Sequence, residues 1–241
     1  MGFSIERHST IDSTNTYAKA LASTGVRNLC ITALRQTGGR GRMGRQFFSP
    51  EGSGLYFSLL VSPTVKGEDG ALLTTFAAVA VAEVLEELTG AKADIKWVND
   101  VYLGGKKVCG ILTEGSVDYA TGAYDYAVIG VGINLHDMHF PTELASIASD
   151  VETETGVRLD RETVLQALLT KFEGMDARIR EGSFMDGYRA RCFVIGKDVT
   201  VFRGTETYPA KVLNVNNRGE LVILQDGVEK ILRSGEVSVR I

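Results

Sequence analysis

The stretch from 71 to 89 constrains the fold more than any other part of the chain. Its apolar residues recur every three or four positions: Leu73, Phe76, Ala80, Val84 and Leu88. This spacing predicts a buried helix that ends at Gly90. The residues flanking the apolar stripe are also apolar, so we expect the helix to be central. Its acids Glu83, Glu86 and Glu87 are expected to form its exposed edge.

Short β-branched or aromatic runs before and after this helix predict the strands of a mixed sheet. They cover residues 29–34, 54–61, 95–98, 101–103, 108–112 and 126–133. Gly104 and Gly105 predict a two-residue hairpin turn between two of these strands. A short helix is predicted to begin within the polar segment 12–15, and a longer one runs from the cap Asp160 to near Gly182. The expected fold class is therefore α+β, a mixed sheet flanked by helices.

The chain changes character after about residue 190. Short predicted strands separated by turn signals follow, at 198–202, 210–215, 221–224, 230–232 and 237–241. Ser234 and Gly235 supply the last of these turns. Short strands at this density predict a small barrel, so we expect a large domain over 1–190 and a small C-terminal domain over 191–241.

The composition is that of an ordinary globular protein. The chain has 241 residues, 44% hydrophobic and 23% charged, which suffices for a core without disulfides. Cys30, Cys109 and Cys192 are odd in number and far apart, which argues against a disulfide framework or a cysteine zinc site and favours a reducing cytoplasm. No apolar run approaches the roughly 20 residues of a membrane helix. The net charge of −4 disfavours general nucleic-acid binding.

A long segment rich in glycine and arginine separates the first two predicted strands. It reads Gln-Thr-Gly-Gly-Arg-Gly-Arg-Met-Gly-Arg over 36–45 and continues to Gly54. Loops of this length in compact domains are usually functional. Glycine lets the backbone approach a ligand, and guanidinium groups match carboxylate and phosphate oxygens, so an anion is the expected ligand. Taken alone, the segment also fits an exposed flexible turn or an RGG-like nucleic-acid segment, although the latter usually lies in a disordered tail.

Two further patterns accompany this loop. Residues 96–100 (Lys-Trp-Val-Asn-Asp) and 106–111 (Lys-Lys-Val-Cys-Gly-Ile) place lysines in apolar strand patterns, where a lysine either points outward or meets an anion. Gly130 and Gly132 alternate along a strand, which leaves one face open to a flat group or a closely packed backbone. Each pattern alone also fits an ordinary structural role.

Together, the motifs resemble those of biotin protein ligases in order and spacing. The matching segments are 12–15 (Asp-Ser-Thr-Asn), 36–45, 96–100, 107–112 and 130–135, and Ser234-Gly235-Glu236-Val237 resembles the terminal barrel of that family. The resemblance implies a catalytic domain with a class II aminoacyl-tRNA synthetase-like fold, followed by an SH3-like barrel. It also implies ATP- and Mg²⁺-dependent activation of biotin to biotinyl-5′-AMP, then transfer of biotin to a lysine of a biotin carboxyl carrier domain.

The resemblance further implies roles for individual residues. The biotin-binding positions are Ser13, Thr14, Asn15, Gln36, Gly39, Arg40, Lys107 and Gly110. The ATP- and adenylate-binding positions are Arg42, Arg45, Phe47, Lys96, Asn99, Asp100 and Asn134, and Asp100 is also the Mg²⁺ position. Lys107, Arg42 and Arg40 are the expected catalytic residues, because cations at these positions offset the negative charge of carboxylate and phosphates.

Some positions depart from the family pattern. Val98 replaces the usual proline and is expected to loosen the turn slightly, and Met43 replaces a common arginine and removes one positive charge. Phe47 stands where the family often has a tryptophan. In a regular strand Lys107 and Gly110 would point to opposite faces, so contact of both with one ligand requires backbone donation or a β-bulge.

Two other functions fit part of the pattern. A lipoate ligase or octanoyl transferase has a related catalytic fold, whereas the segments 36–45 and 96–100 favour biotin. A biotin-sensing DNA-binding repressor would carry an added amino-terminal domain, for which Ser13 lies too near the start. We therefore expect a monofunctional cytoplasmic ligase that forms a homodimer and has no DNA or membrane partner.

Overall fold

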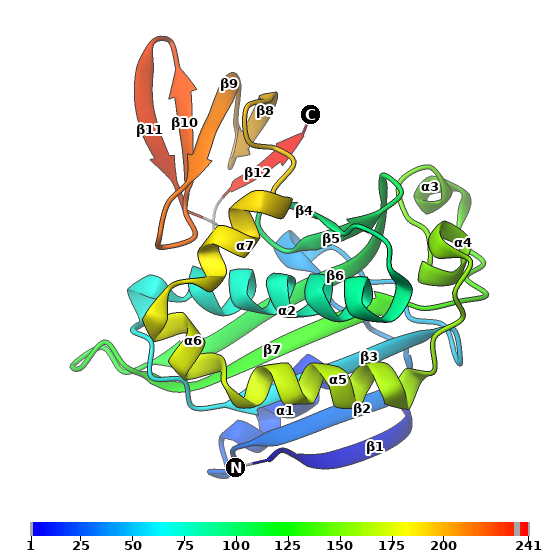
Figure 1. Ribbon diagram of the computed structural model, residues 1–241. Helices are drawn as coiled ribbons and strands as arrows, with labels where there is room; N and C mark the ends of the chain where they lie inside the picture. Colours follow the sequence, from blue (N-terminus) through cyan, green and yellow to red (C-terminus); the bar gives the residue numbers. More distant parts are fainter. Residues whose placement is uncertain (1, 234–236, 241) are drawn as a thin grey trace.

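The centre of the molecule is a seven-stranded mixed sheet with strand order β1-β2-β3-β7-β6-β5-β4 (Figure 1). The computed structural model describes residues 2–233 and 237–240. The strands are β1 (Ser4–Ile11), β2 (Leu29–Gln36), β3 (Gly54–Val61), β4 (Asp94–Lys96), β5 (Asp100–Leu103), β6 (Lys106–Val117) and β7 (Tyr124–Asn134). β1 and β2 are parallel, and the other neighbours are antiparallel. The predicted mixed sheet is confirmed.

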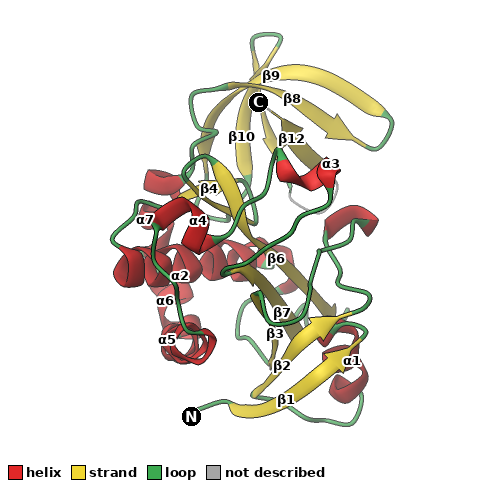
Figure 2. Cartoon of the chain, turned by 90° about the vertical axis from the view of Figure 1, so that its right-hand side faces the viewer, coloured by secondary structure: helices red, strands yellow, loops and turns green. Residues whose placement is uncertain are grey.

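Helices cover the two faces of this sheet unequally (Figure 2). They are α1 (Thr14–Ala22), α2 (Ala71–Thr89), α3 (Thr142–Ala145), α4 (Val151–Thr155), α5 (Arg161–Glu173), α6 (Met175–Glu181) and α7 (Phe184–Arg191), with short 3-10 helices at Arg42–Gly44 and Gly67–Asp69. α2, α5, α6 and α7 lie on one side of the sheet, and the short α1 lies on the other. The second side is therefore the more open one.

The strands β3 and β7 divide their side chains between these two sides. The odd-numbered residues 55–61 of β3 join α2 and α5 in the large core, and we call this side the helix face. Ser58 and Leu60 of β3 point toward α1, and we call that side the α1 face. Gly130 and Gly132 of β7 lie on the α1 face beside Asn15 and Phe47.

The helix α2 is the buried central helix that the sequence predicts. It ends at Gly90, which has φ +72°, a left-handed conformation that glycine adopts without strain. Phe76 is fully buried, and its ring meets those of Phe172 and Phe184 at centroid distances of 5.7 and 5.5 Å. The helix face is thus a closely packed apolar layer.

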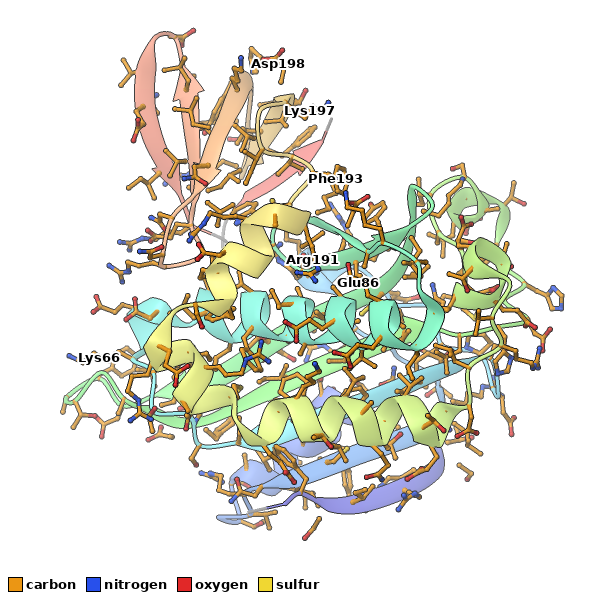
Figure 3. All side chains as sticks on the ribbon, in the orientation of Figure 1. Lys66, Glu86, Arg191, Phe193, Lys197 and Asp198 are labelled. Atoms are coloured by element: carbon orange, nitrogen blue, oxygen red, sulfur yellow. The ribbon has the colours of Figure 1, made fainter. Side chains whose placement is uncertain are left out.

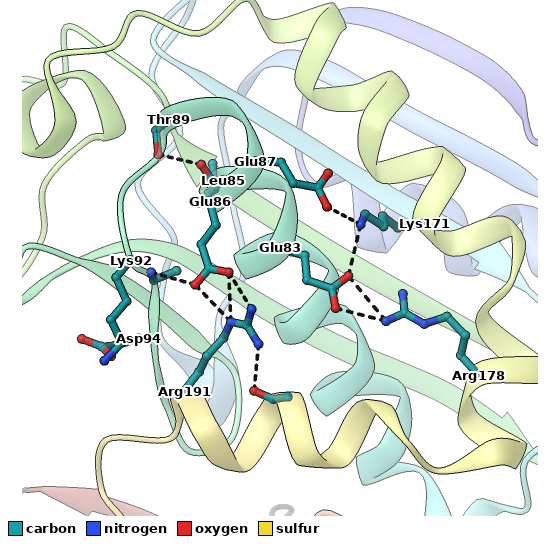
Figure 4. Close-up of polar contacts among 12 residues, drawn as sticks. Glu83, Leu85, Glu86, Glu87, Thr89, Lys92, Asp94, Lys171, Arg178 and Arg191 are labelled. Carbon is teal, nitrogen blue, oxygen red and sulfur yellow. Dashed lines mark hydrogen bonds and ion pairs between the residues drawn. The ribbon is translucent and has the colours of Figure 1, made fainter.

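The acids of α2 do not form the purely exposed edge that the sequence suggests. Glu83 pairs with Lys171 at 3.3 Å and with Arg178 at 3.1 Å (Figure 4). Glu86 pairs with Arg191 at 2.5 Å. These contacts join α2 to α5, α6 and α7. Helical spacing could not reveal them, because the partner cations lie far along the chain.

Several other predicted elements need correction. The helix predicted from Asp160 to Gly182 is two helices, because Gly174 (φ −97°, ψ 8°) leaves the helical conformation between α5 and α6. The strand predicted at 95–98 is the shorter β4, since a turn follows Lys96. The sequence pattern does not predict β1, a mostly polar edge strand whose pairing with the buried β2 outweighs its weak local preference.

The last part of the chain forms a second sheet, with strand order β11-β10-β9-β8-β12. Its strands are β8 (Asp198–Arg203), β9 (Glu206–Val215), β10 (Leu221–Gln225), β11 (Val228–Leu232) and β12 (Val237–Arg240). Within the described residues no strand ladder joins β11 to β12, so the predicted barrel is not confirmed as closed. The predicted turn at Ser234 and Gly235, with Glu236 and Ile241, lies outside the described residues.

The two sheets meet around β4. Trp97 donates its indole N–H to the carbonyl of Gly219 at 3.0 Å. Cys192 forms a bridge with Ile95, and Phe193 follows on the segment between α7 and β8 (Figure 3). Buried residues of β8, β9 and β10 belong to the same apolar cluster as α2. The C-terminal sheet is therefore packed against the β4 end of the main sheet.

No helix in the described part of the chain has the length and apolar character needed to cross a membrane.

Candidate functional site

A cavity of about 920 Å³ opens on the α1 face of the main sheet. Its wall includes all the predicted site residues except Gly39: Ser13, Thr14, Asn15, Gln36, Arg40, Arg42, Arg45, Phe47, Lys96, Asn99, Asp100, Lys107, Gly110 and Asn134. They come from the start of α1, the end of β2 and the loop after it, the β4–β5 region, β6 and β7. The fold thus brings motifs that are distant in sequence to one cavity.

Gly39 contributes to the loop backbone instead of the cavity wall. Its carbonyl accepts a hydrogen bond from the Phe47 N–H at 3.0 Å, which closes the glycine- and arginine-rich loop on itself. A Cβ at Gly39 would collide with the Phe47 carbonyl oxygen and would lie 2.7 Å from Ser49 Oγ. Glycine is therefore required here by the close approach of two backbone segments.

The floor of the cavity is formed where the glycines of β6 and β7 leave room. A Cβ on Gly132 would lie 2.5 Å from Cε1 of Phe47, and one on Gly110 would lie 3.0 Å from Cε2 of the same ring. Gly130 makes similar room for Asn15, whose Oδ1 would collide with a Cβ there. The close approach predicted at alternating glycines is confirmed, and the approaching groups are side chains of the site itself.

A chain of buried polar groups lines one wall. The Gln36 Oε1 accepts from the Thr14 N–H (2.9 Å) and hydroxyl (3.1 Å), and Gln36 Nε2 donates to Ser49 Oγ at 3.0 Å. Ser49 in turn donates to the Phe47 carbonyl at 3.0 Å. Ser58 Oγ lies 2.7 Å from Thr14 Oγ1. Because each group has partners on both sides, the Gln36 amide has a defined orientation.

Asn15 and Arg40 meet at an acidic residue on β6. Asn15 Nδ2 donates to the Leu112 carbonyl at 3.2 Å and to Glu114 Oε2 at 3.0 Å. Glu114 also pairs with Lys19 at 2.7 Å and with Arg40 at 3.1 Å. Burial alone would raise the pKa of Glu114, but these donors and cations outweigh it and lower that pKa. The carboxylate is therefore ionised at neutral pH.

Lys107 and Gly110 both face the cavity, because β6 contains a bulge. Val101 of β5 pairs with Cys109 while Tyr102 pairs with Lys107, so Val108 is the extra residue. A Cβ on Gly110 would lie 3.3 Å from Lys107 Nζ, which places the two residues on the same side. Of the two alternatives that the sequence left open, backbone donation or a bulge, the structure shows the bulge. Lys107 Nζ forms an ion pair with Asp100 at 2.7 Å.

Arg42 reaches from the loop to the turn between β4 and β5. Its Nη1 donates to Asn99 Oδ1 at 3.0 Å, and Asn99 Nδ2 donates to the Ile111 carbonyl at 2.9 Å. Burial lowers the pKa of the Arg42 guanidinium from its usual value, although Arg42 remains a cation at neutral pH. The side chain of Arg42 thus connects the glycine- and arginine-rich loop to the turn between β4 and β5.

Asn134, at the end of β7, lines the cavity and carries a buried side-chain oxygen that is not hydrogen-bonded within the described residues. Its Nδ2 donates to the Ser149 carbonyl at 3.0 Å, whereas its buried Oδ1 has no hydrogen-bond partner within the described residues. A buried acceptor without a partner is costly, so it favours a ligand that donates an N–H or O–H at this point.

Sequence reasoning missed several residues of this site. Ser58 is fully buried in the otherwise apolar β3, and this isolated polar residue was the signal that could have identified it. Glu114 had no comparable signal, because β6 becomes polar around it. An apolar part of the wall, at Phe48, Phe140, Leu144 and Ile147, comes from segments with no strong motif.

Comparisons with known proteins agree with this geometry. The sequence model of the Biotin/lipoate A/B protein ligase family matches residues 8–134. The bifunctional ligase/repressor BirA of Bacillus subtilis is 33% identical over 238 residues, covering 96% of this chain and 73% of that protein. The biotin--[acetyl-CoA-carboxylase] ligase of Paracoccus denitrificans is 30% identical over 235 residues, covering 94% and 96%.

A solved structure is similar over the whole length. The biotin protein ligase from Aquifex aeolicus in complex with biotin and ATP superposes with a TM-score of 0.83 at 30% sequence identity, and the match covers 98% of both chains. The match includes the C-terminal sheet as well as the main sheet. The chain therefore belongs to the biotin/lipoate A/B protein ligase family.

Proposed function

We propose that this chain is an ATP-dependent biotin protein ligase, which forms biotinyl-5′-AMP and then transfers biotin to a lysine of a biotin carboxyl carrier domain. The observation that carries the proposal is the convergence of Arg40, Arg42, Lys96 and Lys107 on one cavity that also holds buried polar groups. Similar proteins named as biotin ligases, one of them with biotin and ATP bound, support the choice of substrates.

In the first half-reaction, a biotin carboxylate oxygen attacks the α-phosphorus of ATP and pyrophosphate leaves. Both reactants are anions, so the site must offset their repulsion and align them. Lys107 pairs with Asp100 and Arg42 donates to the adjacent Asn99, so both cations lie close together in the cavity, where they offset charge on the carboxylate and the α-phosphate. The substrate carboxylate is itself the nucleophile, so the reaction needs no nucleophile from the protein.

The polar chain at Ser13, Thr14, Asn15 and Gln36 suits the ureido ring of biotin, which both donates and accepts hydrogen bonds. The unpaired Oδ1 of Asn134 suits the adenine amine. In the second half-reaction, the amine of the acceptor lysine attacks the acyl carbon and AMP departs. The glycine- and arginine-rich loop excludes water while the adenylate waits, which prevents its hydrolysis.

The residues present are compatible with Mg²⁺ that arrives with ATP. Asp100 is the carboxylate of the predicted site that would hold the ion, and it is at present paired with Lys107. When bound, Mg²⁺ would offset part of the negative charge of the ATP phosphates. Because Asp100 is already neutralised by Lys107, we expect the phosphates to supply most of the ligands.

The proposal extends to assembly, domains and location. β6 pairs with β5 only up to Gly110, whereas it pairs with β7 up to Val117, so residues 113–117 have an open edge in the described structure that suits a homodimer. We further propose a catalytic domain over 1–190 and a C-terminal domain over 191–241 that is an SH3-like barrel. The three buried, unpaired cysteines favour a cytoplasmic protein.

Biotin-dependent exchange of pyrophosphate with ATP tests the function, followed by transfer to a carrier domain. We expect exchange with biotin and none with lipoate or octanoate. Lys107→Ala should reduce exchange by about a hundredfold, because one charge-stabilising donor is lost. Lys106→Ala is the matched control, since Lys106 donates to the Ser146 carbonyl outside the cavity. Exchange with lipoate instead of biotin, or near-normal exchange in Lys107→Ala, would contradict the proposal.

A further inference from the structure

Glu114 lies outside the set of residues that the motifs assign, yet it touches two members of that set. It is on β6, on the α1 face, and its side chain is 20% exposed. Its carboxylate contacts Asn15 at the start of α1 and Arg40 at the base of the glycine- and arginine-rich loop. One carboxylate therefore connects two separate segments of the cavity wall.

The carboxylate determines which way the Asn15 amide faces. An ionised carboxylate only accepts hydrogen bonds, so Asn15 must turn its Nδ2 toward Glu114 and toward the Leu112 carbonyl. The amide Oδ1 then faces Ser58, which donates to it at 2.6 Å. Both polar atoms of the Asn15 side chain are in this way hydrogen-bonded, Nδ2 to two acceptors and Oδ1 to one donor.

The same carboxylate holds Arg40. The Arg40 side chain is 43% exposed, and among the described residues Glu114 is the acidic group with which it pairs, at 3.1 Å. A long exposed arginine samples many rotamers unless a partner restrains it. Lys19, the third partner of Glu114, supplies a second cation at 2.7 Å but does not line the cavity.

We propose that Glu114 is a positioning residue of the site, which orders the Asn15 amide and the Arg40 guanidinium before biotin binds. The proposal rests on the function proposed above. Glu114 does not touch the reacting atoms; it reduces the ordering that biotin binding must otherwise provide. Its loss should therefore weaken the binding of biotin more than it slows the chemical step, and it should leave the binding of ATP nearly unchanged.

Glu114→Gln and Glu114→Ala are compared with the wild-type chain by biotin-dependent pyrophosphate exchange. Glu114→Gln keeps the shape but loses the charge, and its amide can also present a donor to Asn15. We expect the KM for biotin to rise about tenfold in Glu114→Gln and further in Glu114→Ala. The KM for ATP should stay within about twofold of wild type, because Glu114 contacts none of the ATP-binding positions. The fall in kcat should be smaller than the rise in the KM for biotin, because Arg40 itself is still present.

Two controls separate positioning from folding. Glu87→Gln removes a similar glutamate ion pair, with Lys171, on the helix face, and it should leave the KM for biotin unchanged. Lys19→Gln removes the one partner of Glu114 that does not line the cavity, and it should have little effect on that KM. In the Arg40→Gln background, Glu114→Gln should raise the KM by a smaller factor, because one of the two positioned groups is already gone.

Each outcome has a separate meaning. A wild-type chain without biotin-dependent exchange would overturn the proposed function and this inference with it. Exchange in the wild-type chain together with an unchanged KM for biotin in both Glu114 variants would overturn the inference alone. Equal losses of kcat and of both substrates' binding, with a lowered unfolding temperature, would show a structural role and also overturn it. If the Glu114 variants do not fold, direct titration of Arg40→Gln and Lys19→Gln with biotin decides: equal loss of affinity in the two contradicts positioning through Arg40.

Discussion

The two faces of the main sheet are built by opposite rules from the same strands. On the helix face, β3 and β7 present large apolar side chains to α2 and α5, and these residues are almost fully buried. On the α1 face, the alternating positions of the same strands include Ser58, Gly130 and Gly132, and a small apolar cluster with α1 forms only farther along, at Leu60 and Val128. The period of two in a strand allows one segment to supply both a core and a binding wall.

This difference separates the residues that stabilise the fold from the residues that surround the cavity. Apolar burial is worth about 25 cal/mol per Å², so the helix face contributes most of the stability. The glycines of the α1 face bury little apolar surface and so contribute less to stability. The polar groups of this face form a fixed hydrogen-bond pattern around the cavity. Substitutions on the helix face should therefore mainly lower the free energy of unfolding, whereas substitutions on the α1 face should mainly raise the KM for biotin.

The largest expected effect is a loss of stability from the helix face. Phe76→Ala removes a fully buried ring that packs on Phe172 and Phe184. Truncations of this kind cost about 3–5 kcal/mol. Denaturant unfolding should show this loss, while the KM for biotin of the folded enzyme at low temperature should stay near that of the wild type. A tenfold rise in that KM with little change in stability would break the division between the faces.

The opposite result is expected for Gly130→Ala on the α1 face. The added Cβ would collide with Oδ1 of Asn15, which Ser58, Leu112 and Glu114 hold in place. Displacing Asn15 should raise the KM for biotin about tenfold, equivalent to about 1.4 kcal/mol. The measurement is pyrophosphate exchange at varied biotin concentration.

The control for this variant is Gly174→Ala. Gly174 has open space where a Cβ would be placed and a negative φ, so the same chemical change should have little effect on the KM. An unchanged KM for biotin in Gly130→Ala would mean that Asn15 can move without weakening biotin binding. It would contradict the prediction that this position of the α1 face serves binding.

The same contrast explains what could be predicted from the sequence. The helix face follows local periodicity, so α2 and its end at Gly90 were predictable from residues 71–90 alone. The motifs of the α1 face were recognisable only together, because their order and spacing resemble those of biotin protein ligases, whereas each alone also fits an ordinary structural role. The requirement that Lys107 and Gly110 meet one ligand left either backbone donation or a bulge, and the structure has the bulge at Val108.

What could not be predicted depends on partners that are distant in the sequence. β1 has a weak strand pattern and exists because β2 offers it an edge. Glu114 looks like any polar strand residue until Asn15 and Arg40 are placed beside it. The acids of α2 look exposed until α6 and α7 bring Arg178 and Arg191 to them. In each case the outcome is decided by tertiary contacts between residues that are far apart in the sequence, so it cannot be predicted from the local sequence.

The smallest expected effect is a pH-dependent change in stability that comes from Glu86 on the helix face. Burial would raise the pKa of Glu86, but hydrogen bonds from Arg191 and the Ala93 N–H and the charges of Arg191 and Lys92 lower it overall (Figure 4). A carboxylate whose pKa is lower in the folded than in the unfolded chain adds stability above its unfolded pKa and loses that contribution as pH falls through its folded pKa. Glu86→Gln should therefore reduce the free energy of unfolding by about 1 kcal/mol at pH 7.

This difference between Glu86→Gln and the wild type should begin to shrink below about pH 4.5, the usual pKa of a glutamate, and should disappear only below the lowered pKa that Glu86 has in the folded chain. Urea unfolding at several pH values measures it, and Glu87→Gln is the control, because Glu87 is more exposed and pairs with Lys171 alone among the described residues. The KM for biotin should not change in either variant, since both acids lie on the helix face. A difference in the free energy of unfolding that is independent of pH would mean that Glu86 stabilises the fold by packing and not by its charge. A raised KM for biotin would mean that the ion pairs of α2 influence the cavity on the other side of the sheet.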